Sequence, residues 1–524
     1  MAIKTEDFLA SHQLLRNPFT EDDSQNDQVF IDLLAESGFR FNHADWEKFC
    51  GYPMGIGTSM VFGSKGSGKS AMRLAMERIF ENDPQTSDKI LLVKYDNFNE
   101  FLEKIKQKIE KKRNKIQNSK WFRKKPVKQF FIDEFKLVNH LDSMLVCSIQ
   151  SIFEKFSKHP QLLENIISGS IHFPENLKKD LYFLATVYLK GSPDYYTKTL
   201  KSLAGKFLVN APLEKIKLWA KDGINFLISS SVASILFAAL TEFPMESPWT
   251  VLIFFATFAS HLSIFRLIKK TYFKKIAESL NSGILVRERE TNDLSNSLAN
   301  LDAEYLDSLT LKNMDIKVNE ELRFQLLKKL LQISSAMGFE RVVVIMDRID
   351  EPHMIMGDKE KMYEFIKPLW NNKLLQMDEN ISFKMLLPKQ LHEYVRKADS
   401  TDANIARWDK QKIIYPFRWS KGELYDLLSD RLRVCRENKS ESYPLLSLFE
   451  SDISKDKVLD VLDKLRQPRF ALKFMYNIIR QGCAEQDKTD EEPVKIGLEV
   501  FYKVKATIER DIIEYYENVG ESPD

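Results

Sequence analysis

The sequence predicts an α/β fold built on a parallel sheet. Short apolar runs of strand length recur along the chain, and longer stretches with helical spacing separate them. In addition, six of the 18 glycines fall between Gly51 and Gly68, where the chain must turn tightly. At 524 residues the chain is too long for one compact core, so several modules are expected.

Composition narrows the function classes. The 77 basic and 75 acidic side chains nearly cancel, which gives no global case for a nucleic-acid binder. The eight histidines are scattered, and the cysteines are far apart and form no C-x-x-C pair, so neither a structural zinc site nor a disulfide framework is expected. The polar N-terminus, Met1 to Arg16, shows no secretion signal. The cysteines are Cys50, Cys147, Cys435 and Cys483.

The glycine cluster contains the motif G-x-x-x-x-G-K-[ST]. A predicted strand, Ser59–Phe62, precedes it, and a predicted helix begins with Ala71–Met76. Its glycines would let backbone N–H groups point at a nucleotide phosphate chain, Lys69 would contact the β- and γ-phosphates, and the Ser70 hydroxyl would bind magnesium. The predicted nucleotide-binding residues are Gly63, Ser64, Lys65, Gly66, Ser67, Gly68, Lys69 and Ser70.

A basic segment follows the next predicted strand, Lys89–Asp96. Between Lys104 and Lys128 there are twelve Lys or Arg residues against one Glu, and Trp121 and Phe122 lie inside the run. Three interpretations stay open: contact with nucleic-acid phosphates with the aromatic rings stacking on bases, contact with an anionic membrane surface, or a solvated helix face.

Two uncharged stretches then predict a membrane hairpin. Gly223–Leu240 has 18 residues and Trp249–Phe265 has 17, each near the lower limit of a spanning helix, roughly 17–25 residues. Lysines and arginines flank the pair but are missing from the short segment between its two halves. This asymmetry predicts a hairpin in the inner, cytoplasmic membrane with both termini cytoplasmic. A buried helical hairpin without a membrane is the alternative.

The run Arg341–Asp347 is the strongest strand in the chain. A continuous apolar run indicates a parallel strand buried on both faces, and this one ends in an acid. Asp347 would hold Mg²⁺ through water beside the glycine-rich loop. Asp350 or Glu351 would orient the attacking water.

Two further strands are predicted, Ile381–Pro388 and Lys412–Pro416. The polar Lys389 and Gln390 follow the first of them, at the end where ligands gather in open parallel sheets, so one of the two would sense the γ-phosphate. The remainder is helical, beginning with a capping box formed by Ser420 and Glu423. Later in it, Arg469 follows a proline at the start of a helix.

Taken together, these residues resemble the AAA+ and STAND side of the P-loop NTPases over residues 59–96 and 341–475. The apolar hairpin between the two halves resembles the KAP family, whose members carry membrane helices at that place. The resemblance implies that Lys69 and Ser70 are the Walker A lysine and magnesium ligand and that Asp347 is the Walker B aspartate. It also places Gln390 or Lys389 at the sensor position and Arg469 at the lid sensor arginine.

The sequence departs from the family at one place. The family pattern after the Walker B strand is Asp-Asp-hydrophobic-Asp-Arg, whereas this chain has Asp347-Arg348-Ile349-Asp350-Glu351. The resemblance therefore implies slow hydrolysis. Either Asp350 or Glu351 supplies the base, or the protein mainly binds ATP, and Arg348 would itself neutralise phosphate charge.

The sequence thus predicts a P-loop NTPase with a large helical insertion, a transmembrane hairpin and a C-terminal helical lid. The expected segments are the N-terminal half of the ATPase core (1–100), a basic helical insertion (101–220), the hairpin (221–270), a helical return (271–340), the C-terminal half of the core (341–416) and the lid (417–524).

The expected function is a membrane-associated switch that binds ATP with Mg²⁺ and hydrolyses it slowly. By analogy with phage-exclusion proteins among bacterial KAP-like proteins, it extends to antiviral defence. The alternatives are a soluble nucleic-acid-dependent ATPase and a non-hydrolysing nucleotide-binding scaffold. Expected partners are ATP, the cytoplasmic membrane and further copies of the chain, with nucleic acid or a phage-derived trigger left open.

Overall fold

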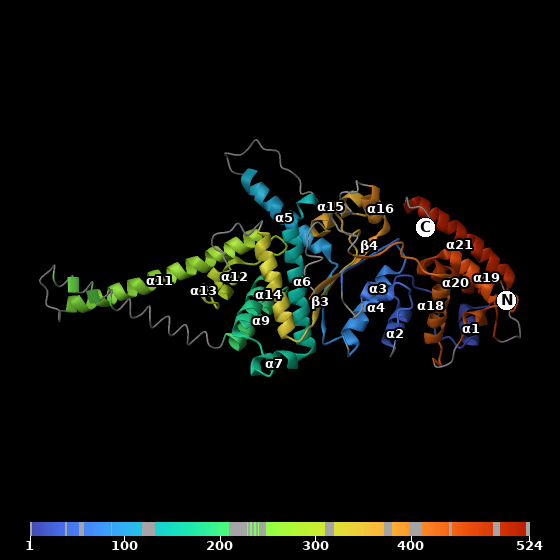
Figure 1. The fold of residues 1–524 in the computed structure, drawn as a ribbon, viewed down its shortest axis with the longest axis horizontal. Helices are drawn as coiled ribbons and strands as arrows, with labels where there is room; N and C mark the ends of the chain where they lie inside the picture. The colour runs from blue at the N-terminus through green and yellow to red at the C-terminus, as the bar shows by residue number, and fades with distance from the viewer. Residues whose placement is uncertain are drawn as a thin grey trace. The chain divides into compact units, whose positions relative to one another are not determined.

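A computed structural model gives the fold of the chain (Figure 1). It divides the chain into two compact units: unit 1 comprises Met1–Asp96 and Arg341–Asp524, and unit 2 comprises Asn97–Glu340. The structure describes residues 3–36, 39–51, 57–84, 86–117, 132–208, 248–309, 319–370, 380–397, 411–439, 443–485 and 493–519, and six positions between 228 and 239.

Unit 1 is a parallel sheet with helices around it. Its strands are β1 (Ser59–Gly63), β2 (Ile90–Tyr95), β3 (Arg341–Met346), β4 (Ile381–Pro388) and β5 (Lys412–Ile414). Its helices are α1 (Thr5–Ser11), α2 (Gln28–Ala35), α3 (Trp46–Cys50), α4 (Lys69–Asn82), α15 (Lys359–Trp370), α16 (Lys389–Lys397), α18 (Lys421–Val434), the 3₁₀ helix η4 (Leu445–Leu448), α19 (Lys455–Leu465), α20 (Pro468–Glu485) and α21 (Leu498–Val519).

The five strands lie in the order β2-β3-β4-β1-β5, and every neighbouring pair is parallel. The predicted α/β fold with a parallel sheet is therefore confirmed. Continuous apolar runs form these strands because side chains on both faces of such a parallel sheet are buried. Along β1, Val61 belongs to the cluster that includes Met72 of α4, whereas the Phe62 ring lies 5.0 Å from the His392 ring of α16. Helices α4 and α16 therefore cover opposite faces.

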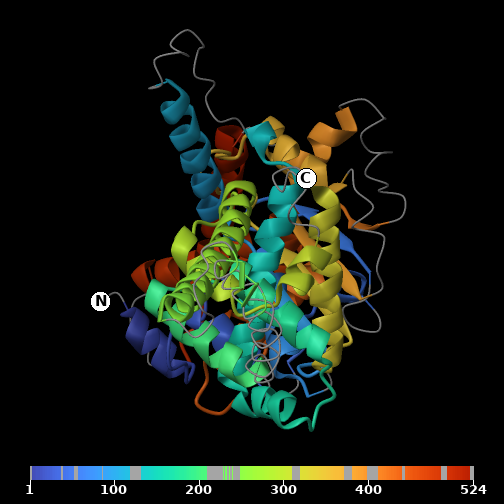
Figure 2. The same cartoon turned by 90° about the vertical axis from the view of Figure 1, so that its left-hand side faces the viewer.

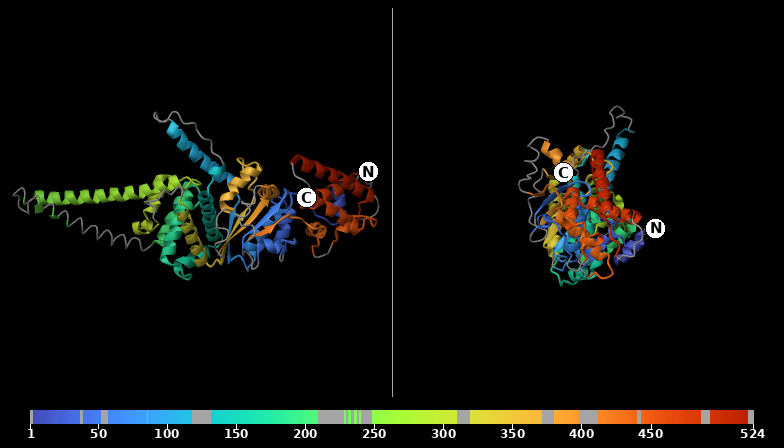
Figure 3. Two further views of the ribbon diagram at one scale, coloured as in Figure 1. Left: turned by 45° about the horizontal axis from the view of Figure 1, so that its top comes forward. Right: turned by 90° about the vertical axis from the view of Figure 1, so that its right-hand side faces the viewer.

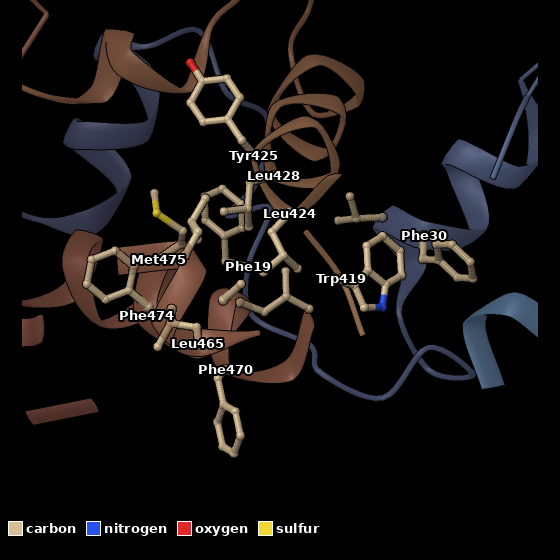
Figure 4. Close-up of a cluster of buried hydrophobic side chains, with 14 of the residues drawn as sticks. Phe19, Phe30, Trp419, Leu424, Tyr425, Leu428, Leu465, Phe470, Phe474 and Met475 are labelled. Atoms are coloured by element: carbon tan, nitrogen blue, oxygen red, sulfur yellow. The ribbon is translucent and has the colours of Figure 1, made fainter. Parts of the chain in front are cut away.

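The C-terminal helices α18–α21 pack together with the N-terminal segment of unit 1 (Figure 3). Phe19 is only 2% exposed and lies among lid side chains such as Leu428 and Met475 (Figure 4). The buried guanidinium of Arg431 donates to the Pro18 carbonyl and to both oxygens of Asp27. Helix α18 begins with the predicted capping box, in which Ser420 and Glu423 exchange hydrogen bonds.

Unit 2 is helical throughout its described residues. Its helices are α5 (Phe98–Gln117), the 3₁₀ helix η1 (Ile132–Glu134), α6 (Leu137–Lys158), α7 (Pro160–Ser168), α8 (Glu175–Tyr188), α9 (Pro193–Phe207), α11 (Pro248–Gly283), α12 (Thr291–Leu298), α13 (Ala303–Ser308) and α14 (Glu320–Ala336). Helices α6 and α14 pack side by side, with α8 against both (Figure 2). The unit brings residues from the predicted segments 101–220 and 271–340 into one body.

The predicted membrane hairpin is wrong. No helix in the described part of the chain is long and apolar enough to cross a membrane. The stretch Trp249–Phe265 is the beginning of the 36-residue α11, and the same helix continues into Arg266, Lys269 and Lys270. Most of Gly223–Leu240 lies outside the described residues. This finding also overturns the predicted placement in the cytoplasmic membrane with both termini cytoplasmic.

Part of the basic segment is bound within unit 2. Lys108 on α5 donates to the backbone carbonyls of Asn281, Ile284 and Arg287, and Lys104 pairs with Glu100 at 2.5 Å. Lys108 therefore anchors α5 to the end of α11 and the turn after it, whereas the Lys104–Glu100 pair lies within α5. Residues 118–131, with Trp121 and Phe122, lie outside the described residues.

Candidate functional site

The carboxyl edge of the sheet brings together residues from distant parts of the sequence. Parallel strands end at the same edge, and the register pairs Tyr95 with Met346 and Gly63 with Pro388. The first residues after β1, β2, β3 and β4 therefore gather there. They are Ser64, Asp96, Asp347 and Lys389.

The crevice for a ligand at this edge falls between β1 and β4. After β1 the chain leads toward β2 at one end of the sheet, and after β4 it crosses to β5 at the other end. Because crossover connections are right-handed, the helices that follow these two strands lie on opposite faces, as α4 and α16 do. Ligands of open parallel sheets bind at such a switch point. The glycine-rich loop lies directly after β1.

Two glycines in the loop have backbone conformations that side-chain-bearing residues rarely adopt. Gly66 has φ +89° and Gly68 has φ +91°. A Cβ atom at Gly66 would lie 2.9 Å from Cδ of Arg469, and one at Gly68 would lie 3.2 Å from the Trp419 ring. Glycine is therefore needed at both places for the loop to pass under the N-terminus of α20 and the segment before α18. Two C-terminal elements thus cover the loop.

Trp419 fixes the loop through a specific bond. Its indole N–H donates to the Ser67 carbonyl at 2.8 Å, and both residues are buried. The Ser67 hydroxyl is also buried and finds no hydrogen-bond partner among the described residues. His43 stacks on Phe417 and meets Trp419 edge-on, so the N-terminal segment supports the same wall of the site.

The lysine of the motif is held by the loop itself. Lys69 begins α4, and its ammonium donates to the carbonyls of Gly63 at 2.6 Å and Ser64 at 2.9 Å. Ser70 is the second residue of the same helix. When a nucleotide binds, charged phosphate oxygens would take the place of the two neutral carbonyl oxygens as acceptors for the Lys69 ammonium, and they would form stronger hydrogen bonds. Lys69 and Ser70 thus lie at the positive end of α4.

Asp347 is the acid at the end of β3, and it is only 3% exposed. Its Oδ1 accepts the Arg348 backbone N–H at 2.9 Å, while its Oδ2 has no hydrogen-bond partner among the described residues. Burial raises the pKa of Asp347, and the positive charges of Arg73 and Lys69 oppose that rise. A buried carboxylate oxygen with open acceptor capacity fits a hydrated cation.

Arg73 links Asp347 to a second strand end. From the second turn of α4, its Nε lies 3.4 Å from Asp347 Oδ2 and its Nη1 lies 2.5 Å from Asp96 Oδ2. Glu77, one turn further along, approaches Arg73 Nε at 3.5 Å and pairs with Lys94. Three carboxylates thus surround one guanidinium at the edge of the sheet, and Lys94 balances one of them.

The residue after Asp347 adopts the left-handed conformation, with Arg348 at φ +63°. Its Nε lies 3.6 Å from Oε1 of Glu351, whose side chain is 58% exposed. Partial burial of that carboxyl group raises the pKa of Glu351. Asp350 and Asp347 add to the rise, and Arg348 and Lys65 oppose it. Glu351 therefore interacts electrostatically with both Lys65 of the loop and Asp347.

The other predicted site residues are placed less decisively. Lys389 begins α16, is 4% exposed and approaches Glu393 at 3.7 Å. Gln390 lies in the same first turn. Asp350 lies in the turn closed by the hydrogen bond from the Gly357 N–H to the Asp350 carbonyl. The contacts given above connect Arg469, Lys69 and Asp347 with the glycine-rich loop. They give no such connection for Lys389, Gln390 or Asp350.

No group of three or more His, Cys, Asp or Glu side chains among the described residues is arranged to hold a metal ion alone. Magnesium is commonly bound by one or two carboxylates together with substrate phosphates and water. Ser70 and Asp347 fit that pattern, because they lie at the start of α4 and directly after β3, at the same edge of the sheet.

Sequence reasoning missed several residues of the site, namely Arg73, Asp96, Trp419 and Asp22, whose Oδ2 lies 3.2 Å from Nε of Arg469. The position of Asp96 directly after a predicted strand was a usable signal, equal in kind to that of Asp347. Arg73 lies one turn after the motif on the predicted helix, so its place near a strand end also followed from the pattern. Asp22 and Trp419 carried no such signal.

Comparison with known proteins adds no relative to this picture. Neither a scan of family models nor searches of the curated proteins and the solved structures returned a match.

Proposed function

We propose that unit 1 binds ATP together with Mg²⁺ and hydrolyses the nucleotide slowly. The observation that carries this proposal is the loop after β1. It has two glycines with positive φ and leads into a lysine and a serine at the start of α4, and beside it, directly after β3, is a buried aspartate whose Oδ2 accepts no hydrogen bond from the described residues. Loops of this kind cradle phosphates with backbone N–H groups, and the serine and aspartate hold magnesium directly or through water.

Each residue of the site would bind a different part of MgATP. Lys69 would turn from the loop carbonyls to the β- and γ-phosphates, and Arg469 lies over Gly66, where it would meet the terminal phosphate. Ser70 and Asp347 would hold the metal, which neutralises phosphate charge when bound. With the membrane hairpin overturned, the resemblance to nucleotide switches rests on these residues alone.

Slow hydrolysis follows from the residues after Asp347. The neighbouring position carries Arg348 in a left-handed conformation, so it supplies a cation where the related enzymes carry an acid. Of the two remaining acids, Glu351 is favoured as the group that orients water, because its pKa is raised and its charge interacts with Lys65 of the loop. Its ion pair with Arg348 lowers its availability as a base.

The first test is nucleotide binding. Isothermal titration with MgATP should show binding to the wild-type protein and a loss of at least about tenfold in affinity for Lys69→Ala, since one charge-assisted contact to phosphate is removed. Lys421→Ala is the matched control, because Lys421 also begins a helix of unit 1 and is exposed. Equal affinity of Lys69→Ala and wild type would remove the assignment.

The second test concerns the base. Glu351→Gln should slow ATP hydrolysis by about 100-fold, the lower end of the range typical of a general base, while leaving MgATP affinity within about twofold. Asp350→Asn is the comparison variant one residue away. If Asp350→Asn slows hydrolysis and Glu351→Gln does not, the roles of the two acids are reversed. If neither does, neither acid is the base.

A further inference from the structure

Arg469, the arginine over the phosphate loop, has a carboxylate partner from the N-terminal segment. Its Nε lies 3.2 Å from Oδ2 of Asp22. The same arginine fills the space beside Gly66: a Cβ atom at Gly66 would lie 2.9 Å from Arg469 Cδ and 3.1 Å from its Nε. One guanidinium therefore lies beside both an internal anion and the predicted phosphate loop.

The structure holds Asp22 at this place through buried anchors on either side of it. Before it, Phe19 is 2% exposed in the lid core, and the Pro18 carbonyl accepts from Arg431 at 2.8 Å (Figure 4). After it, the buried Asp27 accepts hydrogen bonds from both terminal nitrogens of Arg431, and its side chain caps α2. The short stretch between the anchors is exposed and presents Asp22 toward α20.

Arg469 comes from the first turn of α20, directly after Pro468. The proline lies 3.4 Å from where a Cβ of Gly68 would be, so the positive end of this helix faces the loop as well. A carboxylate is the side-chain group closest in charge and geometry to a phosphate for pairing with an arginine. Asp22 therefore makes the contact that a terminal phosphate would make.

We propose that Asp22 is a specificity-determining residue of the nucleotide site: its carboxylate occupies Arg469 until the γ-phosphate of a nucleoside triphosphate replaces it. This inference rests on the proposed function. A diphosphate lacks the group that reaches Arg469 and leaves the Asp22–Arg469 pair intact. A triphosphate exchanges one anion for another at the guanidinium, and the exchange frees the segment between Phe19 and Asp27 from α20.

The solvent exposure of the two side chains sets the expected change in ATPγS affinity. The side chains of Asp22 and Arg469 are 38% and 21% exposed, so the pair is of the partly solvated kind. Removing such an internal competitor should strengthen binding of the displacing ligand by about two- to fivefold. Only the triphosphate should gain, because only it displaces Asp22.

The experiment measures the affinities of ATPγS and ADP, each with Mg²⁺, by isothermal titration of the full chain. Asp22→Asn should raise the affinity for ATPγS about two- to fivefold and leave that for ADP unchanged. Asp23→Asn is the matched control, since it removes one charge from the neighbouring exposed residue, whose carboxylate accepts local hydrogen bonds from Gln25 and Asn26. It should leave the ratio of the two affinities at the wild-type value.

A double-mutant cycle identifies the route of the effect. Arg469→Gln should lower the affinity for ATPγS relative to ADP, and in that background Asp22→Asn should have no further effect on the ratio. Weaker ATPγS binding in Asp22→Asn would overturn the inference, because Asp22 would then orient Arg469 for phosphate instead of competing with it. An equal gain for ADP would overturn it too, since it would reflect general charge repulsion.

Nucleotide binding by unit 1 and the role of Asp22 are tested by different outcomes of this experiment. If the wild-type protein binds neither nucleotide, the proposed function itself is wrong. If it binds both and Asp22→Asn leaves their ratio at the wild-type value, the nucleotide site stands and only the role of Asp22 is lost.

Discussion

Both units contain buried aspartate–arginine pairs, and the pair in the helical core of unit 2 is built differently from the pair at the sheet edge of unit 1. In unit 2, Arg323 on α14 grips Asp142 on α6 with two hydrogen bonds, of 3.1 and 2.9 Å, and both side chains are fully buried. The Tyr188 hydroxyl donates to the same carboxylate at 2.7 Å. In unit 1, Arg73 lies 3.4 Å from Asp347 without forming a hydrogen bond to it, and Asp347 Oδ2 has no hydrogen-bond partner among the described residues.

The difference separates a structural role from a ligand-binding one. A satisfied ion pair holds two helices in register, and both oxygens of its carboxylate accept hydrogen bonds. A carboxylate left with open capacity at the end of a strand costs stability unless something else fills it. Variants of the two pairs and of the residues around the loop test that difference.

Arg323→Met should destabilise the protein by about 3–5 kcal/mol, because Asp142 would remain as an uncompensated buried charge. Urea unfolding followed by circular dichroism measures this. Lys111→Met is the control: it breaks the pair between Lys111 and Glu288, whose side chains are 63% and 62% exposed, and should cost less than about 1 kcal/mol. Similar losses for the two variants would contradict the structural role of Arg323.

Asp347→Asn should affect activity far more than stability. We expect ATP hydrolysis to fall by about 100-fold, equivalent to ~2.7 kcal/mol of barrier, because the metal-binding charge is gone. The free energy of unfolding should change by less than about 1 kcal/mol, since Arg73 keeps its contacts to Asp96 and Glu77. Steady-state hydrolysis and urea unfolding of the same preparation decide it. A strongly destabilised variant with normal hydrolysis would make Asp347 a structural residue like Asp142.

Lys384 in the centre of β4 makes the folding stability of unit 1 depend on pH, because it has no carboxylate partner in its described hydrogen bonds. In unit 2, lysines such as Lys104 and Lys179 pair with carboxylates. Lys384 is fully buried and donates to the Phe49 and Gly57 carbonyls, and burial lowers its pKa from 10.5 to about 7. Between those two values the unfolded chain binds a proton that the folded chain has released, so the stability contributed by this residue rises with pH.

The measurement is urea unfolding of wild type and Lys384→Met at pH 7, 8 and 9. Wild type should gain stability relative to the variant by up to about 1.4 kcal/mol per pH unit across that range. Two curves that stay parallel would show that the Lys384 ammonium remains protonated in the folded protein.

Trp419→Phe should give the smallest effect. It removes the hydrogen bond to the Ser67 carbonyl and leaves that buried acceptor unpaired, at a cost of about 0.5–1.5 kcal/mol. If the loop is held ready for phosphate, MgATP affinity should fall by about two- to tenfold. Trp46→Phe controls for loss of indole volume beside Phe41, and it should leave the affinity unchanged. Equal effects of the two variants would assign the loss to packing.

Sequence patterns predicted the parts of unit 1 whose physical cause is local. Continuous apolar runs gave the strands, because both faces of a parallel sheet are covered, and the spacing of Ser420 and Glu423 gave a helix start. Glycine spacing predicted the loop from Gly63 to Gly68, where positive φ is needed. These are constraints that a short stretch of chain satisfies by itself.

Contacts between distant stretches were not predictable in that way. Nothing in the residues around Asp22 or Trp419 signals that they meet the loop, since each depends on how α18 and α20 fold back onto the sheet. The membrane prediction failed because an uncharged run of 17 residues is also compatible with one part of a longer, partly charged helix. Hydropathy alone does not separate those two outcomes at the short end of the range.

A crystal structure of the wild-type protein with Mg²⁺ and ATPγS would test the central claim most directly. The account predicts phosphate oxygens within hydrogen-bond distance of the loop from Gly63 to Ser70 and of Lys69 Nζ, a metal between Ser70 and Asp347, and an Asp142–Arg323 pair unchanged in geometry. Nucleotide bound away from the loop, or a loop that stays closed on Lys69 at saturating ligand, would contradict it.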